Sequence, residues 1–289
     1  MAETKVYILI PVHNRRATTL KCLQALDRNG DLQRYTVVVI DDGSTDGTAT
    51  AIRSHYPMVT ILPGTGDLWW TGAIAKGMHH AARESADQIF WLNDDCHPEP
   101  GCLSLLVQFL QDRPGAIAAP TCAISATGAV VETGCRGRRR LMAAPGKVVQ
   151  VDNLSGYCVG MTIAVYHRLG TPNPKRFPHY SGDDVYTMQA NRAGFPIYLL
   201  GDAHATLHDL ATPEYGFTAH ITARLGGSPS FSMVFLAKKS RYYLPTQFFY
   251  HIAKYGHCFG VPLFLLKFAG WVCKYVAVSA SRRRLPRSP

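Results

Sequence analysis

The chain has few charged residues and no long run of them. Only 17% of its 289 residues are Asp, Glu, Lys or Arg, while 47% are hydrophobic. This balance supplies enough apolar surface for a sizeable core and excludes global disorder. No internal repeat or low-complexity segment occurs, which excludes a repeat architecture. The length suits one large domain, or one domain with an appendage.

Paired cysteine motifs are also absent. The eight cysteines include no CxxC pair and no zinc-like spacing, and each lies among apolar or glycine-rich neighbours. We therefore expect buried, reduced thiols rather than disulfides or a zinc site. The first residues lack a basic segment followed by an apolar stretch and a cleavage site, so they are expected to form a strand rather than a signal peptide. These absences predict a cytoplasmic protein.

Positive charge is in excess, with a formal net charge of +10. An anionic partner is implied, and nucleic acid, a lipid surface and phosphorylated substrates all qualify. A nucleic-acid-binding protein should carry a continuous basic groove with stacking aromatics, whereas the basic clusters here are local and terminal, so no nucleic-acid partner is expected. One cluster, from Arg136 to Arg140, could be a solvated turn or could grip phosphate or lipid headgroups.

Strand-like and helix-like segments alternate through the first half. Short apolar runs at residues 6–12, 37–40, 58–62 and 89–92 predict strands. Helical patterns lie between them, one after Asn14 as a plausible cap and one at residues 49–55. Such alternation predicts an α/β fold with parallel strands and crossover helices.

Segments rich in polar residues follow three of these predicted strands. The segments are Val12-His13-Asn14, Asp41-Asp42-Gly43-Ser44 and Asn93-Asp94-Asp95. Ligands of open α/β sheets collect at the carboxyl ends of the strands. The three exits together predict a binding site, where one alone would be a turn.

The acidic pairs are the candidates for chemistry. Adjacent carboxylates repel one another unless a cation is near, and Mg²⁺ typically uses one or two carboxylates plus substrate phosphates. Asp94-Asp95 could therefore bind a metal or be an ordinary turn. Asp41-Asp42 could read a nucleotide base or cap the next helix. Asp183-Asp184 begins a predicted helix at residues 181–194, where acidic residues are expected anyway, yet a general base must be a fixed carboxylate.

Five motifs in order carry a resemblance to glycosyltransferase family 2. They are IPVHNR from residue 10, VVIDDGSTDGT from 38, GDLWWTGAIAKG from 66, FWLNDDCHPEPGCL from 90 and GDDVYTMQANRAGF from 182. The chain resembles the family over about residues 5–210, and the segment from Gly66 to Trp70 is similar to its rhamnosyltransferase-like branch. The resemblance implies a GT-A fold, a nucleotide-diphosphate sugar donor and inversion at the anomeric carbon.

The same resemblance assigns roles residue by residue. On the donor side, Pro11, Val12 and Asn14 would line the nucleotide pocket, and Asp42, alone or with Asp41, would read the pyrimidine base. The segment from Gly66 would pass beside the nucleotide, with Trp69 or Trp70 near the donor. Asp95 would bind Mg²⁺ or Mn²⁺, and Asn93 stands where the family often has the first Asp of its DxD motif. His208 falls where some relatives supply a metal ligand, with His204 as a competitor. Asp184 would be the catalytic base, and Gly156, Tyr157 and Asp183 would border the acceptor.

The composition shifts beyond about residue 245. We expect a GT-A glycosyltransferase domain at residues 1–245 and an amphipathic, basic helical tail at 246–289. Lys267 and Lys274 share one helical face, which favours a helix lying in a membrane interface over one that crosses it. The arginines at 282–284 and 287 would add attraction to anionic lipids. A helix packed on protein is the alternative.

The function expected is an inverting, metal-dependent glycosyltransferase. It would move a sugar from a UDP- or dTDP-sugar to a glycan or lipid-linked acceptor hydroxyl in bacterial surface polysaccharide biosynthesis, at the inner face of the cell membrane. A nucleotidyltransferase should show a Gly-rich basic signature after the first strand, where this chain reads PVHNRR. A non-catalytic sugar-nucleotide binder stays open, suggested by Asn93, and so does a basic nucleic-acid-binding protein.

Overall fold

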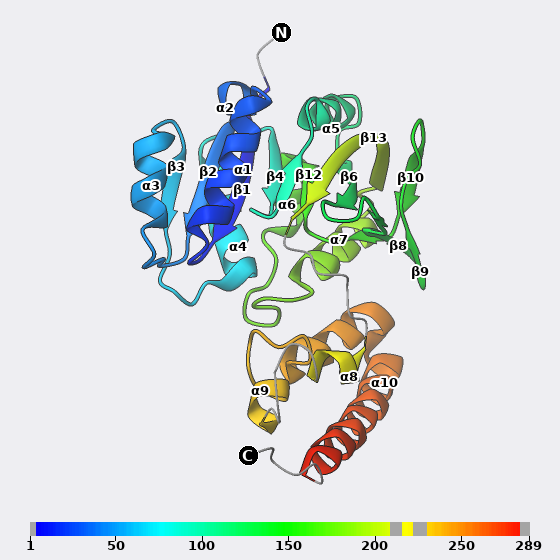
Figure 1. Cartoon of the computed structure of the whole chain (residues 1–289). Coiled ribbons are helices and arrows are strands. Elements are labelled where there is room, and N and C mark those ends of the chain that lie inside the picture. Colours follow the sequence, from blue (N-terminus) through cyan, green and yellow to red (C-terminus); the bar gives the residue numbers. More distant parts are fainter. Residues whose placement is uncertain (1–3, 209–215, 222–229, 284–289) are drawn as a thin grey trace. The chain divides into compact units, whose positions relative to one another are not determined.

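The computed structural model describes residues 4–208, 216–221 and 230–283 (Figure 1). The chain forms two compact units, Met1–Asp209 and Leu210–Pro289, and each is described by itself. The division expected at residue 245 from the change in composition stays a prediction; the compact units divide between Asp209 and Leu210.

The first unit is built on one large sheet with the strand order β10-β13-β6-β12-β4-β1-β2-β3, to which β5 and β7 add at β13 and β6. The strands on one side are β1 (Val6–Val12), β2 (Thr36–Asp41), β3 (Thr60–Pro63) and β4 (Gln88–Leu92). The others are β5 (Cys96–Pro98), β6 (Ile117–Ile124), β7 (Val130–Val131), β10 (Val148–Val151), β12 (Cys158–Thr162) and β13 (Ile197–Leu207).

The four strands expected from the sequence are present and lie side by side. β3, β2, β1 and β4 pair in parallel. Their apolar runs continue without alternation because both faces of a parallel sheet are covered, and β4 is buried along its whole length. Beyond β4 the sheet is mixed rather than purely parallel, since β12 runs antiparallel to β4 and to β6. The α/β fold class is confirmed.

Helices of the first unit connect and cover these strands. They are α1 (Arg16–Arg28), α2 (Asp31–Arg34), α3 (Thr48–His55), α4 (Trp69–Arg83), α5 (Cys102–Gln111), α6 (Ile163–Leu169) and α7 (Gly182–Arg192). α4 packs on β1 and β2, and α5 packs on β6 and β13. Gly77 lets α4 approach closely, because a Cβ there would lie 2.9 Å from Ile40 and 3.0 Å from Leu9.

A small second sheet lies beside α7. Its order is β11-β8-β9, with β8 (Gly134–Arg136), β9 (Arg139–Leu141) and β11 (Asn153–Leu154). β8 and β9 form an antiparallel hairpin, and β11 pairs antiparallel with β8 and contacts α7. Through β11, the small sheet therefore joins the arginine-containing β8–β9 hairpin to α7.

The second unit is helical, with α8 (Phe217–Ala219), α9 (Phe231–Phe235) and α10 (Leu244–Arg283). α10 is kinked at Gly256, where φ is 74°, a value that glycine tolerates. Phe217, Val234 and Phe235 form its core with aromatic residues of α10, including Trp271. Within α10, the stretch Leu244–Ala280 is long and apolar enough to cross a membrane by length and composition, and only 6% of its most apolar window is buried.

All eight cysteines are free, as expected. Five are buried, while Cys135 is half-buried and Cys258 and Cys273 are exposed on α10. The expectation of burial is therefore wrong for these three, because Cys135 lies on β8 of the only partly covered small sheet and the other two lie at exposed positions of α10.

Candidate functional site

The first segment of the site is the polar turn after β2, held by the turn after β1. Asn14 accepts a hydrogen bond from the Thr45 backbone N–H at 2.8 Å, and its own N–H donates to Ser44 Oγ at 2.9 Å. The Nδ1 of His13 lies 2.6 Å from the carbonyl oxygen of Asp42. Asn14 thus joins two strand exits and does not cap α1, whose N-cap residue is Arg15.

Asp42 holds the loop that leads into α4. One carboxylate oxygen accepts from the Gly66 N–H at 2.7 Å and the other accepts from the Trp69 N–H at 2.9 Å. Gly64 must be glycine here, since a Cβ would lie 2.6 Å from the Asp42 carboxylate. Asp41 accepts from the Ser44 N–H at 2.9 Å. Both aspartates are buried, and Asp42 brings the predicted residues Gly66 and Trp69 against the β2 exit.

Trp70 joins three further segments. Its indole N–H donates to the side-chain oxygen of Asn93 at 2.8 Å. A Cβ on Gly156 would lie 3.0 Å from the Trp70 ring and 2.8 Å from the Cβ of Asp183. Only glycine therefore lets these segments meet, which explains the small residue that the sequence indicated on the acceptor side. Trp70 also packs edge-on against Trp91 of β4, with ring centroids 5.6 Å apart.

The turn after β4 carries the two candidate metal carboxylates in different surroundings. Asp94 points inward: its side chain is 5% exposed and accepts from Thr19 Oγ1 at 2.9 Å. Asp95 is more open, at 21% exposed. Arg15 lies between them, with Nε 3.0 Å from Asp94 and Nη2 3.1 Å from Asp95. A cation therefore accompanies the pair, as the repulsion between adjacent carboxylates requires.

The pKa of Asp94 is raised to about 6. Burial is the main cause, Arg15 opposes the rise, the nearby Asp95 charge adds to it, and the hydrogen bond from Thr19 opposes it. Desolvation exceeds the attraction of Arg15 because the Asp94 carboxyl is enclosed by protein on nearly all sides. Asp94 is thus a structural carboxyl of the turn, and Asp95 is the one that faces outward.

His208 lies directly beside Asp95. Its backbone N–H donates to the carbonyl oxygen of Asp95 at 2.7 Å, because the end of β13 pairs with β5. Its ring lies 4.1 Å from the ring of His97, centroid to centroid. His204 lies four residues before His208, on β13, where its backbone carbonyl accepts from the Glu99 N–H. Of the two competing histidines, His208 is the one adjacent to Asp95.

Asp183 and Asp184 begin α7 and are held from the small sheet and its following segment. Asp183 accepts from the Gly156 N–H at 2.5 Å, and Asn153 of β11 donates to Asp184 at 2.8 Å. Burial raises the pKa of Asp183, while backbone N–H groups and Arg140 act to lower it. Tyr157 accepts through its backbone carbonyl from the Asn93 N–H at 2.9 Å, which connects this region to the metal-candidate turn.

Backbone strain gathers at these segments. Four non-glycine residues in the described part of the chain have positive φ, and three of them are Asn14, Trp69 and Ser181. Positive φ is costly for a bulky residue such as tryptophan. Strain of this kind persists where surrounding contacts over-determine the backbone, and it is common at active sites.

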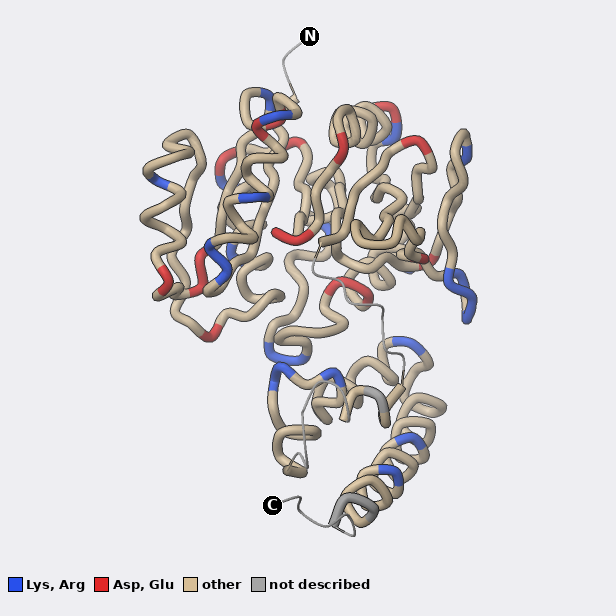
Figure 2. The backbone as a smooth tube through the Cα atoms, in the orientation of Figure 1, with Lys and Arg blue, Asp and Glu red and all other residues tan. Residues whose placement is uncertain are grey.

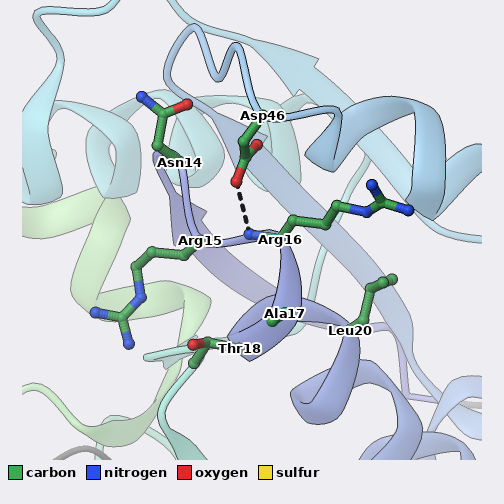
Figure 3. Close-up of a pocket in the computed structure, with 7 residues that line it drawn as sticks. All are labelled: Asn14, Arg15, Arg16, Ala17, Thr18, Leu20 and Asp46. Carbon is green, nitrogen blue, oxygen red and sulfur yellow. Dashed lines mark hydrogen bonds between the residues drawn. The ribbon is translucent and has the colours of Figure 1, made fainter.

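A surface pocket of about 650 Å³ borders the same edge at the start of α1 (Figure 3). Its lining residues are Asn14, Arg15, Arg16, Ala17, Thr18, Leu20 and Asp46. Figure 3 shows the Asp46 carboxylate on the backbone N–H of Arg16, a contact of 2.9 Å. Among the predicted nucleotide residues only Asn14 lines this pocket, so the hollow adjoins the site and does not enclose it.

Sequence similarity to known proteins identifies the family of this chain. The model of Glycosyl transferase family 2 matches residues 7–161, more than half of the chain. The chain belongs to glycosyl transferase family 2. The matched region includes every strand exit described above except the end of β13, and the resemblance found in the sequence motifs is confirmed. The narrower likeness to the rhamnosyltransferase-like branch stays a prediction.

This family 2 member also resembles individual proteins. Galactofuranosyltransferase GlfT1 of Mycobacterium tuberculosis (strain CDC 1551 / Oshkosh) is 28% identical over 95 residues, which are 32% of this chain and 31% of that protein. The GlfT1 of strain ATCC 25618 / H37Rv matches equally. The match thus spans about a third of the length of these relatives.

Two solved structures share the fold. GalNAc-T7 with UDP, GalNAc and Mn²⁺ matches with a TM-score of 0.59 and 13% identity, over 71% of this chain and 44% of that one. The mannosyltransferase PcManGT from Pyrobaculum calidifontis, in complex with GDP-Man and Mn²⁺, matches with a TM-score of 0.55 and 16% identity, over 97% and 80%. The expected GT-A architecture is confirmed.

Several residues of the site were not identified in the sequence. Arg15, Thr19 and Asn153 contact the candidate carboxylates. Arg15 and Thr19 are separated from their carboxylates by 75 to 80 positions in the sequence, and Asn153 is separated from its own by 31. No local pattern connects residues so far apart. The only available signal is that an enclosed acidic pair needs a cation nearby, which made a basic residue after the first strand a reasonable candidate.

The enclosed carboxyl predicts a pH effect that Asp94→Asn should remove. Because the pKa of Asp94 is raised to about 6 in the folded chain, folding favours its protonated form. The stabilisation is present below pH 4 and is lost as pH rises through 6. The full shift corresponds to about 3 kcal/mol, and we expect wild type to lose roughly 2 kcal/mol of it relative to the variant between pH 4 and pH 7.

The measurement is the free energy of unfolding by urea at pH 4 to 7, for wild type, Asp94→Asn and the exposed control Asp112→Asn. Asp112→Asn should follow wild type at every pH. Parallel profiles for wild type and Asp94→Asn would contradict the raised pKa.

Proposed function

We propose that this chain transfers a sugar, with inversion, from a nucleotide-diphosphate donor to an acceptor hydroxyl. The observation that carries the proposal is the meeting of Trp70, Asn93, Gly156 and Asp183 at the carboxyl edge of the sheet. This meeting joins the donor loop, the metal-candidate turn and the helix that bears Asp184. A donor and an acceptor held there would face one another.

In this proposal the donor nucleotide lies along the exits of β1 and β2. Pro11 and Val12 end β1 and Asn14 follows it, while Asp41 ends β2 and Asp42 follows it. Since the Asp42 carboxylate already accepts from the Gly66 and Trp69 N–H groups, its role is to fix the loop around the nucleotide. Asp41, which accepts from one backbone N–H through one oxygen, is the better candidate to read a pyrimidine base. UDP and dTDP remain equal candidates, because they differ at the base by a methyl group.

The residues present fit a divalent metal bound together with the donor. Asp95 is the outward carboxylate and His208 adjoins it through the backbone. One carboxylate and one imidazole are few ligands, which suits Mg²⁺ or Mn²⁺ completed by diphosphate oxygens. When bound, such an ion would stabilise negative charge on the leaving diphosphate. Asn93 adds no charge because its side chain is a neutral amide, and its oxygen already accepts from Trp70.

The chain itself supplies the base and its orientation. Asp184 would take the proton of the acceptor hydroxyl, and Asn153 holds one of its oxygens at 2.8 Å. Asp183 fixes the Gly156 segment instead. Gly156 and Tyr157 would border the acceptor, with Gly156 next to Trp70 of the donor loop. No covalent sugar intermediate is needed for inversion, because the hydroxyl attacks the anomeric carbon directly.

Asp184→Asn tests the base. Its amide can still meet Asn153 but cannot take a proton, so transfer should fall by about 10² to 10⁴-fold, while nucleotide and Mn²⁺ binding are retained. The measurement is transfer of radiolabelled sugar from UDP- and dTDP-sugars to a bacterial membrane extract, alongside calorimetric titration with the nucleotide diphosphate.

Asp112→Asn, an exposed change at the end of α5, serves as the control and should keep wild-type transfer. Wild-type rates in folded Asp184→Asn would contradict the assignment. If the wild-type chain binds the nucleotide diphosphate but transfers no sugar, the result would favour a non-catalytic sugar-nucleotide binder.

We further propose that α10 rests on a membrane surface and that the acceptor is a glycan or lipid-linked hydroxyl of bacterial surface polysaccharide biosynthesis. Phe259 is 77% and Leu266 is 72% exposed. They lie seven residues apart and therefore on one face of the helix. Lys267 and Lys274 interrupt the apolar surface, and Gly256 kinks it. These features favour an interfacial helix at the inner face of the cell membrane.

The double change Phe259→Ser with Leu266→Ser should weaken binding to phosphatidylglycerol-containing vesicles by about tenfold or more, since it removes two large apolar side chains from the contact. Vesicle flotation measures it. Cys258→Ser with Cys273→Ser, two exposed positions of the same helix, should leave binding unchanged. Resistance of the bound protein to alkaline carbonate extraction would contradict the interfacial position and indicate a spanning helix.

A further inference from the structure

The β8–β9 hairpin carries four arginines in five residues, Arg136 and Arg138 to Arg140. All four are exposed, and Figure 2 shows them as a basic segment at the end of the hairpin. None has a role in the donor site or in the proposed proton transfer. The turn is held in place, because the Gly137 N–H donates to Asp152 at 2.6 Å.

The register of the small sheet sorts these arginines onto two faces. Arg140 pairs with Cys135, and Cys135 pairs with Asn153. Residues directly opposite one another in a sheet point to the same face, while successive residues alternate. Arg140, Cys135 and Asn153 therefore form one row. Arg136 and Arg139 pair with each other and face the other way.

The row ends at the proposed catalytic base. Asn153 donates its side-chain N–H to Asp184 at 2.8 Å, so its face of the small sheet is the face toward Asp184. The Cα of Arg140 lies two strands from that of Asn153, roughly 10 Å at the usual strand spacing. A guanidinium on this row can hold a group attached to an acceptor whose hydroxyl is at Asp184.

The electrostatics agree with this placement. Burial raises the pKa of Asp183, and the charge of Arg140 is among the influences that lower it. Arg140 is thus near enough to act electrostatically on Asp183, the neighbour of the proposed base. Among the described residues, one N–H group of Arg140 donates to the carbonyl oxygen of Glu132 at 3.3 Å, and a guanidinium offers five donors.

We propose that Arg140, with Arg138 at the adjacent turn, binds a phosphate group carried by the acceptor. The proposal rests on the proposed transferase function and deepens it, because it names the acceptor class: a hydroxyl compound that bears a phosphate or diphosphate. The planar fork of a guanidinium matches phosphate oxygens, and such charge-assisted hydrogen bonds fix orientation as well as affinity. The phosphate would anchor the acceptor while Asp184 meets its hydroxyl.

Arg140→Gln and Arg139→Gln form a matched pair for the test, since both remove one charge from the same hairpin but from opposite faces. The chain is first saturated with Mn²⁺ and the nucleotide diphosphate that binds it, so that the donor site is filled. Farnesyl diphosphate, inorganic pyrophosphate and farnesol are then titrated by calorimetry. We expect farnesyl diphosphate to bind about tenfold more weakly to Arg140→Gln, and Arg139→Gln to stay within about twofold of wild type.

The other arms distinguish the source of the phosphate. Equal losses for pyrophosphate and farnesyl diphosphate would support recognition of the anion whatever carries it, and a loss confined to farnesyl diphosphate would support a lipid-borne acceptor. Farnesol should show no dependence on Arg140. Arg140→Lys, which keeps charge but not the fork, should fall between wild type and Arg140→Gln.

Equal affinities in Arg139→Gln and Arg140→Gln, with nucleotide binding intact, would overturn this inference alone. If wild type binds no nucleotide diphosphate, the proposed function itself fails. Circular dichroism checks that each variant is folded, and the exposure of both arginines makes a folding defect unexpected.

Discussion

The hydrogen bond from the Trp70 indole to Asn93 is the interaction on which the arrangement of the site depends. It joins the first turn of α4 to the turn after β4 at 2.8 Å. The same ring lies so near Gly156 that a Cβ there would be 3.0 Å from it, and the Gly156 N–H donates to Asp183 at the start of α7. Three segments that are far apart in the sequence are thereby fixed around one aromatic side chain, which itself packs against the buried Trp91.

This arrangement gives a physical reason for the asparagine at position 93. The side chain must accept a hydrogen bond from Trp70, and both aspartate and asparagine could do so. Asp94 and Asp95 already follow, with Arg15 as the cation between them. A third carboxylate would add repulsion in a place where burial already raises the pKa of Asp94. Asparagine keeps the acceptor oxygen and avoids that charge.

Much of the fold could be predicted, because its signals are local. The apolar runs predicted the first and last residues of β1 to β4 to within two positions. The polar residues after these runs predicted the carboxyl edge of the sheet. The antiparallel insertion of β12 between β4 and β6 could not be predicted, since pairing of distant strands leaves no periodic signature.

The site was predictable at the level of motifs and not at the level of partners. Asn14 shows the difference: its type suits a helix cap, yet tertiary contact makes it a clamp on Thr45. Likewise, the ion pairs of Arg15 and the row from Arg140 to Asp184 arise only when the sheet register is known.

The central claim is that the carboxyl edge of the sheet binds a nucleotide diphosphate with a divalent metal. Thermal unfolding with UDP, dTDP, GDP and CDP, each with and without Mn²⁺, tests it most directly, because a ligand that binds only the folded chain raises the midpoint by mass action. The account predicts a rise with UDP or dTDP that depends on Mn²⁺. No rise with any of the four nucleotides, in a folded sample, would contradict it.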